Sequence, residues 1–107
     1  MVKNREYCKR VAEEIEEYAA GKMVDDDGEK LSLYDYLVDA LDFEFIIDNR
    51  KEYKSSKIWI TLGGPSIWID TAERAVKIAW GTDREEYPLD WDVCDKIDDI
   101  MQEIYEC

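Results

Sequence analysis

Residues 57–70 have the sequence KIWITLGGPSIWID, in which isoleucines recur at every second position on either side of a Gly-Gly-Pro turn. Alternation with a period of two, in runs rich in β-branched and aromatic residues, is the sequence signal of a β-strand. Glycine and proline supply the backbone conformations that a turn between two strands needs. The segment therefore predicts a β-hairpin, around which the rest of the fold can be built.

Two further strand patterns flank this hairpin. Alternation in residues 42–48 places Phe43, Phe45 and Ile47 on one face, and alternation in residues 74–80 places Val76 and Ile78 on one face. A short turn over residues 71–74 continues the hairpin into an antiparallel meander. Residues 49–56 and 81–88 show no such alternation, so we expect them to be loops.

The register between the strands follows from matching their apolar faces. On this basis we expect Ile60 to lie opposite Ile69, and Leu62 to lie opposite Ile67. The next turn then sets Ile69 opposite Val76. One face of the predicted sheet is therefore apolar throughout.

Three segments have the apolar spacing of amphipathic helices. They cover residues 3–20, a short stretch that begins at Ser32 and ends near Leu41, and residues 91–106, for which Asp90 is a good N-cap. The predicted order is ααββββα. The sequence thus predicts a two-layer α+β fold, with a four-stranded antiparallel meander and three helices, in a single domain over residues 1–107.

The charge of the chain restricts its partners. Its 107 residues include 27 Asp and Glu against 14 Lys and Arg, which gives a net charge of −13. Phosphate repulsion argues against direct binding to nucleic acid, and the same charge argues against anionic membranes. The charge favours a partner with a basic surface.

The residue types argue against catalysis and against a cofactor or metal. The sequence has no histidine, which is the commonest general base and metal ligand. The acidic segment at residues 25–29 lacks the ligand spacing of a calcium loop. Cys8 and Cys94 lie on apolar helix stripes and Cys107 is terminal, with no paired spacing among the three. We expect no catalytic residue, no metal, no cofactor, and a reducing, cytoplasmic setting without a signal peptide or membrane span.

The negative charge gathers at the end of the chain. Residues 82–107 contain ten acids and two bases, and seven of the 17 residues from Asp90 to Glu106 are acidic. Helical spacing places four acids on a stripe opposite the apolar one: Asp92, Asp95, Asp99 and Glu106. Two more acids, Asp98 and Glu103, flank this stripe. The preceding segment would extend it with Asp83, Glu85 and Glu86. These nine acids are candidate partner-binding residues, with Trp91 or Tyr87 nearby for shaped contacts. The alternative is that the stripe is only a solvated face.

Two tryptophans form a second candidate binding surface. In the expected register Trp59 lies opposite Asp70 and Trp68 opposite Thr61, so the two indoles are diagonal neighbours on the outer sheet face. With Ile46 opposite Trp59 they would form an exposed apolar patch for a partner or for a second copy in a homodimer. The alternative is that a helix or loop covers them.

Parts of the sequence resemble a known group of proteins. The run Leu62–Thr71, followed by Trp80-Gly81 and Tyr87-Pro88-Leu89, resembles a family of small acidic proteins carried by phages and mobile elements of gut Firmicutes, as does the stretch from Tyr34 to Asn49. In size, charge and layout the chain is also similar to the acidic anti-CRISPR proteins. Several of these occupy the DNA-binding channels of CRISPR nucleases by mimicking nucleic-acid charge. This second resemblance is one of class, and it carries over no individual residue.

The charge pattern and the resemblance together lead to one expectation of function. The protein would be a non-enzymatic inhibitor of a DNA-binding protein, most concretely a type II anti-CRISPR protein that blocks a basic DNA-binding groove of a CRISPR nuclease, in the host cytoplasm if it is encoded by a phage. The first alternative is a generic interaction module, such as an immunity protein or antitoxin that binds a basic partner. A self-associating structural protein is the second.

Overall fold

The computed structural model describes residues 2–107, with side chains from Asn4 onward, and shows an α+β fold. The helices are α1 (Val2–Ala19), α2 (Leu33–Val38) and α3 (Trp91–Glu106). The strands are β1 (Asp42–Ile47), β2 (Tyr53–Thr61), β3 (Ser66–Asp70), β4 (Ala75–Trp80) and β5 (Asp83–Pro88). All strand pairs are antiparallel, in the order β1-β2-β3-β4-β5.

The sheet has five strands, so the prediction of four was wrong. Residues 83–88, expected to be a loop, pair with β4 along its whole length. Trp80 lies opposite Asp83, which leaves Gly81 and Thr82 as a two-residue turn. Gly81 has φ +63°, a conformation that glycine adopts at no steric cost at the first position of such turns. The sequence pattern did not predict β5, because it is an edge strand with several charged residues and no alternation of apolar residues.

The β2–β3 pairing also differs from the expected register. Ile58 lies opposite Ile69 and Trp59 opposite Trp68, and an irregularity after Trp59 then places Thr61 opposite Ile67. Strand β2 starts at Tyr53, so part of the expected 49–56 loop is strand. The expected register was two residues away from the observed one before the irregularity and one residue away after it. A shift of two positions preserves which face each side chain occupies, so the faces of Ile58, Trp59, Trp68 and Ile69 were predicted correctly. Leu62, expected on the inner face, instead lies beyond the end of β2 and is 55% exposed.

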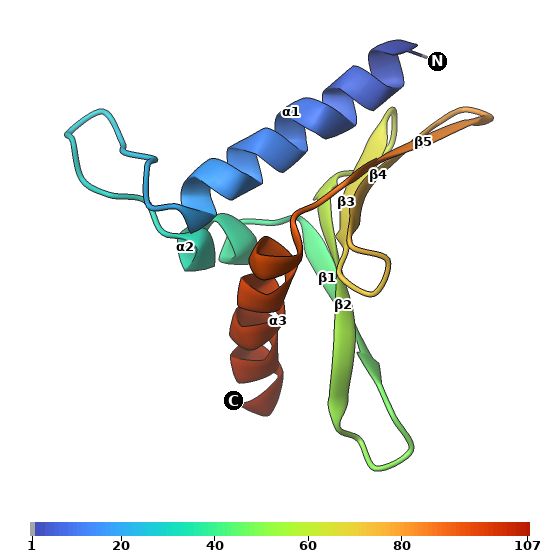
Figure 1. Ribbon diagram of the computed structural model, residues 1–107. Helices are drawn as coiled ribbons and strands as arrows, with labels where there is room; N and C mark the ends of the chain where they lie inside the picture. Colours follow the sequence, from blue (N-terminus) through green and yellow to red (C-terminus); the bar gives the residue numbers. More distant parts are fainter. Residues whose placement is uncertain (1) are drawn as a thin grey trace.

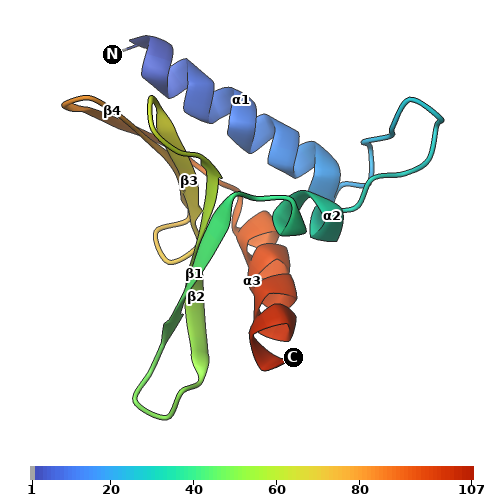
Figure 2. The same cartoon turned by 180° about the vertical axis from the view of Figure 1, so that it is seen from behind.

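All three helices lie on one face of the sheet (Figures 1 and 2). Helix α1 crosses β4 and β5, while α3 lies against β2. The core between the layers is built from fully buried side chains of every helix and of the three central strands: Cys8, Ala12 and Ile15; Leu37; Ile97 and Met101; Ile58, Ile69, Val76 and Ile78. The opposite face of the sheet carries no helix.

The local helix signals were confirmed. Ser32 accepts a hydrogen bond from the Asp35 amide and Asp35 reciprocates, which makes a capping box. Asp90 caps α3 by accepting from the amides of Asp92 and Val93. Helix α2 ends before the expected Leu41 because the Leu41 amide already donates to the Trp59 carbonyl, as the chain enters the sheet.

Candidate functional site

The outward face of α3 is a row of carboxylates. Its sheet-facing side buries Val93, Cys94, Ile97 and Met101 in the core. The opposite side exposes the five acids that helical spacing had grouped there or beside the stripe: Asp92, Asp95, Asp99, Glu103 and Glu106. Lys96 is the one basic residue of α3, and its ammonium is directed to the Ala19 carbonyl at the end of α1, 3.3 Å away. We call these five acids the acidic face.

The members of the acidic face differ in their contacts. Asp95 receives a hydrogen bond from Arg74 at 3.4 Å, and Glu106 receives one from Gln102 at 3.0 Å. Within residues 4–107, the carboxylates of Asp92, Asp99 and Glu103 take part in no hydrogen bond or ion pair. Three of the five carboxylates are therefore hydrated and available to a partner.

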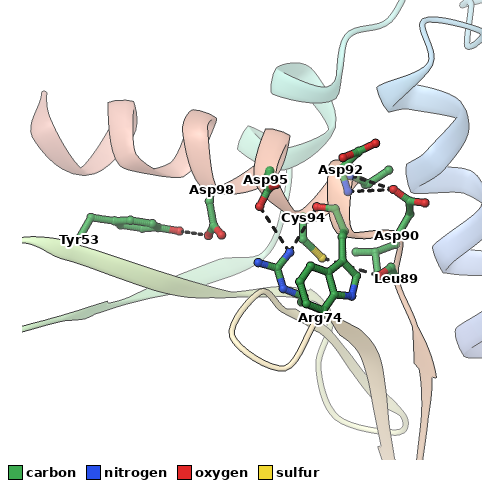
Figure 3. A network of polar contacts seen from close by, with 10 residues as sticks. Tyr53, Arg74, Leu89, Asp90, Asp92, Cys94, Asp95 and Asp98 are labelled. Atoms are coloured by element: carbon green, nitrogen blue, oxygen red, sulfur yellow. Dashed lines mark hydrogen bonds and ion pairs between the residues drawn. The ribbon is translucent and has the colours of Figure 1, made fainter.

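Asp98 does not belong to this face. It is half-buried and accepts a 2.6 Å hydrogen bond from the hydroxyl of Tyr53 on β2 (Figure 3). Burial, together with that bond, raises the pKa of Tyr53. The Tyr53 hydroxyl also contacts the Ser56 hydroxyl at 2.6 Å. The hydrogen bond of Asp98 with Tyr53 therefore links α3 to strand β2 of the sheet.

The structure does not bring Asp83, Glu85 and Glu86 to the acidic face. They lie on β5, which ends at Pro88, and β5 and α3 extend in different directions on either side of Leu89 (Figure 1). Because side chains alternate along a strand, Glu85 and Glu86 point to opposite faces of the sheet. Glu86 lies 3.9 Å from the Lys77 ammonium, whereas Glu85 is half-buried on the side of α1. The expected extension of the stripe through a preceding loop was wrong, because that segment is a strand.

Arg74 is a residue that sequence reasoning missed. Its guanidinium lies 4.2 Å from the centroid of the Trp91 ring and 3.4 Å from an Asp95 oxygen, and it donates to the Trp91 carbonyl at 3.3 Å (Figure 3). The contact joins the β3–β4 turn to the start of α3. The partners are 17 and 21 positions apart along the chain, so no local pattern could have shown it.

The aromatic residues expected near the acidic face have different environments. Trp91 is 70% exposed. Tyr87 is half-buried and lies beneath the guanidinium of Arg5 from α1, with 5.2 Å between the ring centroid and Cζ. Trp91 therefore remains a candidate contact residue, while Tyr87 serves the packing of α1 on β5.

The outer sheet face holds the second candidate surface. Trp59 and Trp68 are stacked, with ring centroids 4.8 Å apart, and no helix covers them (Figures 1 and 2). Both are half-buried, and the Trp59 indole N–H donates to Glu44 at 3.1 Å. Ile46 lies opposite Ser55 rather than Trp59, so it does not extend the pair into the patch that the sequence predicted.

Charges of both signs surround this tryptophan pair. The Lys77 ammonium, on the strand next to Trp68, lies 2.7 Å from Glu73, 3.9 Å from Glu86 and 4.0 Å from Asp70. The hydrogen bond to Glu73 and the attraction of the other carboxylates raise the pKa of Lys77. The outer face is thus a mixed surface, unlike the acidic face of α3.

The two helix thiols are buried, and the acidic 25–29 loop forms a local turn. Burial raises the pKa of the Cys8 and Cys94 thiols to about 11, so both are protonated near neutral pH. Within the described chain no group of three or more Cys, Asp or Glu could hold a metal ion. In the 25–29 loop, Asp25 accepts from the amides of Asp27 and Glu29 and so stabilises its own turn.

A cleft of about 440 Å³ lies between the end of α1, the segment before α2 and the middle of α3. Its lining includes Tyr18, Leu33 and Ile100, together with the charged residues Lys96 and Asp99. Asp99 therefore belongs both to the cleft and to the acidic face.

Comparison with protein-family models, with curated proteins and with solved structures gave no match. Across residues 2–107, no helix has the length and apolar character to cross a membrane. The surfaces described above are therefore the basis on which a function can be proposed.

Proposed function

We propose that this protein is a non-enzymatic inhibitor of a nucleic-acid-binding protein, and that the acidic face of α3 occupies the partner's basic groove. The observation that carries the proposal is the set of three exposed carboxylates, Asp92, Asp99 and Glu103, that form no ion pair within residues 4–107. A basic groove built for phosphates would supply the missing cations.

The spacing of the charges is compatible with this role. From Asp92 to Glu106 the helix rises about 21 Å, at about 1.5 Å per residue, and presents five exposed carboxylates. The average is one charge per roughly 4 to 5 Å, against one per roughly 3.4 Å along a DNA strand. The acidic face is therefore somewhat less dense in charge than one strand of DNA.

The position of the acids also supports a use beyond solubility. Glu103 and Glu106 lie in the last turn of α3, where the helix dipole disfavours negative charge, by up to about 1 kcal/mol per group. No basic residue occupies the last turn. Acids that cost stability at these positions are accounted for if they bind a partner.

The most concrete partner is a type II CRISPR nuclease, which holds its DNA in basic grooves. The resemblance in size, charge and layout to acidic anti-CRISPR proteins supports this choice, and it implies action in the host cytoplasm. An immunity protein or antitoxin that binds a basic toxin would use the same acidic face. The two hypotheses therefore differ only in the partner that is bound, a nuclease or a toxin.

The test compares two variants that carry equal net charge. Asp92→Lys with Asp99→Lys and Glu103→Lys reverses the acidic face, and Glu6→Lys with Glu13→Lys and Glu17→Lys reverses three exposed acids of α1. Each set changes the net charge by six units, from −13 to −7. The assay measures DNA cleavage by a panel of guide-loaded type II nucleases as the inhibitor is titrated, and thermal unfolding verifies that both variants fold.

We expect the wild type and the α1 variant to inhibit similarly, and the α3 variant to lose inhibition by roughly tenfold or more, because like charges then face each other across the groove. Equal inhibition by both variants would show that the acidic face is only a solvated surface. If the protein inhibits none of the nucleases and instead binds a basic toxin in a charge-dependent way, the immunity-protein alternative is favoured.

A further inference from the structure

Trp91 is the most exposed large hydrophobic side chain within residues 4–107, with 70% of its surface accessible. It is the first residue of α3, immediately before Asp92, so it lies at one end of the acidic face. A solvated tryptophan in this position has an apolar surface that a partner could bury, and tryptophan is among the residues most enriched at binding hot spots.

The ring is held in place before any partner arrives. The Arg74 guanidinium lies 4.2 Å from the ring centroid, and Arg74 also donates to the Trp91 carbonyl and to Asp95. Arg74 has φ +55°, a left-handed conformation that costs a non-glycine residue about 1–2 kcal/mol. Arg74 is the last residue of the turn between Asp70 and Ala75, so its left-handed conformation belongs to that turn. A fixed ring loses little conformational entropy on binding.

Arg74 also shows which chemistry fits this place. One guanidinium here contacts both the indole face and the Asp95 carboxylate. Arginine stacks on aromatic faces and pairs with carboxylates through its planar fork, whereas lysine offers only a compact ammonium. Arg74 covers one face of the ring, and the large exposed fraction of Trp91 leaves the other face open.

We propose that the open face of the Trp91 indole receives an arginine side chain of the partner. The inference rests on the proposed function, because it takes the partner surface to be basic. It adds that Trp91 selects arginine over lysine, whereas the rest of the acidic face attracts both through charge alone.

A structural role for Trp91 would make a different prediction. If the ring only fastens the β3–β4 turn to α3, its removal would lower stability without changing any preference among cations. Trp80 is the matched control, because it is also an exposed tryptophan, at 46%. It is the last residue of β4, next to the turn that leads into β5.

The test uses two peptides, seven arginines and seven lysines, so that no partner has to be identified. At low ionic strength the net charge of −13 attracts both peptides. Binding is measured by calorimetry and by the indole N–H signals in NMR spectra. For the wild type we expect the arginine peptide to bind about two- to fivefold more tightly than the lysine peptide, the size of an exposed cation–π contact.

Trp91→Ala should make the two affinities equal, Trp91→Phe should restore part of the difference, and Trp80→Ala should leave it unchanged. The proposal is overturned if the wild type binds both peptides equally, or if Trp91→Ala keeps the preference for arginine and only lowers the melting temperature. The peptide result does not depend on inhibition of a nuclease, so failure of the proposed function and failure of this inference are separate outcomes.

Discussion

Trp59 and Trp68 lie directly opposite each other on β2 and β3, and their indole rings are stacked at 4.8 Å with an angle of 30° between their planes. Both tryptophans alternate with the buried residues Ile58 and Ile69, so they point to the opposite face of the sheet. No helix lies on that face (Figure 2). Each ring shields one side of the other, which explains why two tryptophans on an uncovered face are only half-exposed.

The tryptophan pair should show a measurable coupling free energy. In a double-mutant cycle with Trp59→Ala, Trp68→Ala and the double variant, we expect the two losses in the free energy of unfolding to be non-additive by about 0.5–1.5 kcal/mol. Urea unfolding followed by circular dichroism at 222 nm measures all four proteins. Strict additivity would mean that the stacking contributes nothing beyond the burial of each ring.

The N-cap of α3 should carry a stability contribution of its own. Asp90 accepts from the amides of Asp92 and Val93, so Asp90→Ala should lower the free energy of unfolding by about 1 kcal/mol. Asp90→Asn keeps an acceptor oxygen and should cost much less. Since α3 carries the acidic face, equal losses in the two variants would point to charge rather than to capping.

Stability should fall at alkaline pH. Burial raises the pKa of Cys8 and Cys94 from 9.0 to about 11, and it also raises the pKa of Tyr36 and Tyr53. A group whose pKa is higher in the folded state contributes stability that is complete below the unfolded pKa and is lost as the pH rises. The urea midpoint should therefore be flat from pH 7 to 8 and should decline from pH 9 to 11.

The variant Cys94→Ala is the control for this pH dependence. It removes one of the shifted thiols, so its decline between pH 9 and 11 should be shallower than that of the wild type. Identical slopes would mean that ionisation of Cys94 is not coupled to unfolding.

The isolated protein should not bind duplex DNA. With a net charge of −13 it repels phosphates, so a short duplex should migrate unchanged in a gel at physiological salt. A basic DNA-binding domain serves as the positive control. A shift at sub-micromolar protein would contradict the proposal that the acidic face replaces DNA in a partner's groove.

Local signals in the sequence were sufficient for the helices and for the central strands. The capping box at Ser32 and the N-cap at Asp90 involve residues within three positions of each other. Strand β5 was missed because pairing with β4 decides its conformation, while its own residues include three acids and little apolar alternation. The β2–β3 register was missed for two reasons: Thr61 rather than Leu62 lies opposite Ile67 beside the turn, and the irregularity after Trp59 adds a second shift.

The candidate site was predicted only as far as helical spacing reaches. Spacing correctly grouped the carboxylates of the acidic face. It could not show that Asp98 turns to Tyr53, 45 positions away, or that Arg74 lies on Trp91. Such contacts depend on how the helix is laid on the sheet, and the local pattern of the chain carries no information about that.

The placement of α1 has a consequence for synthesis on the ribosome. Its apolar side, with Cys8, Ala12 and Ile15, packs on β4 and β5, and β5 ends at Pro88, 69 residues after Ala19. At about 5–20 residues per second, α1 emerges roughly 3 to 14 s before its last partner strand is made. During that interval its apolar stripe is open to chaperones and to other nascent chains, and the helix nearest the start of the chain is among the last to be packed.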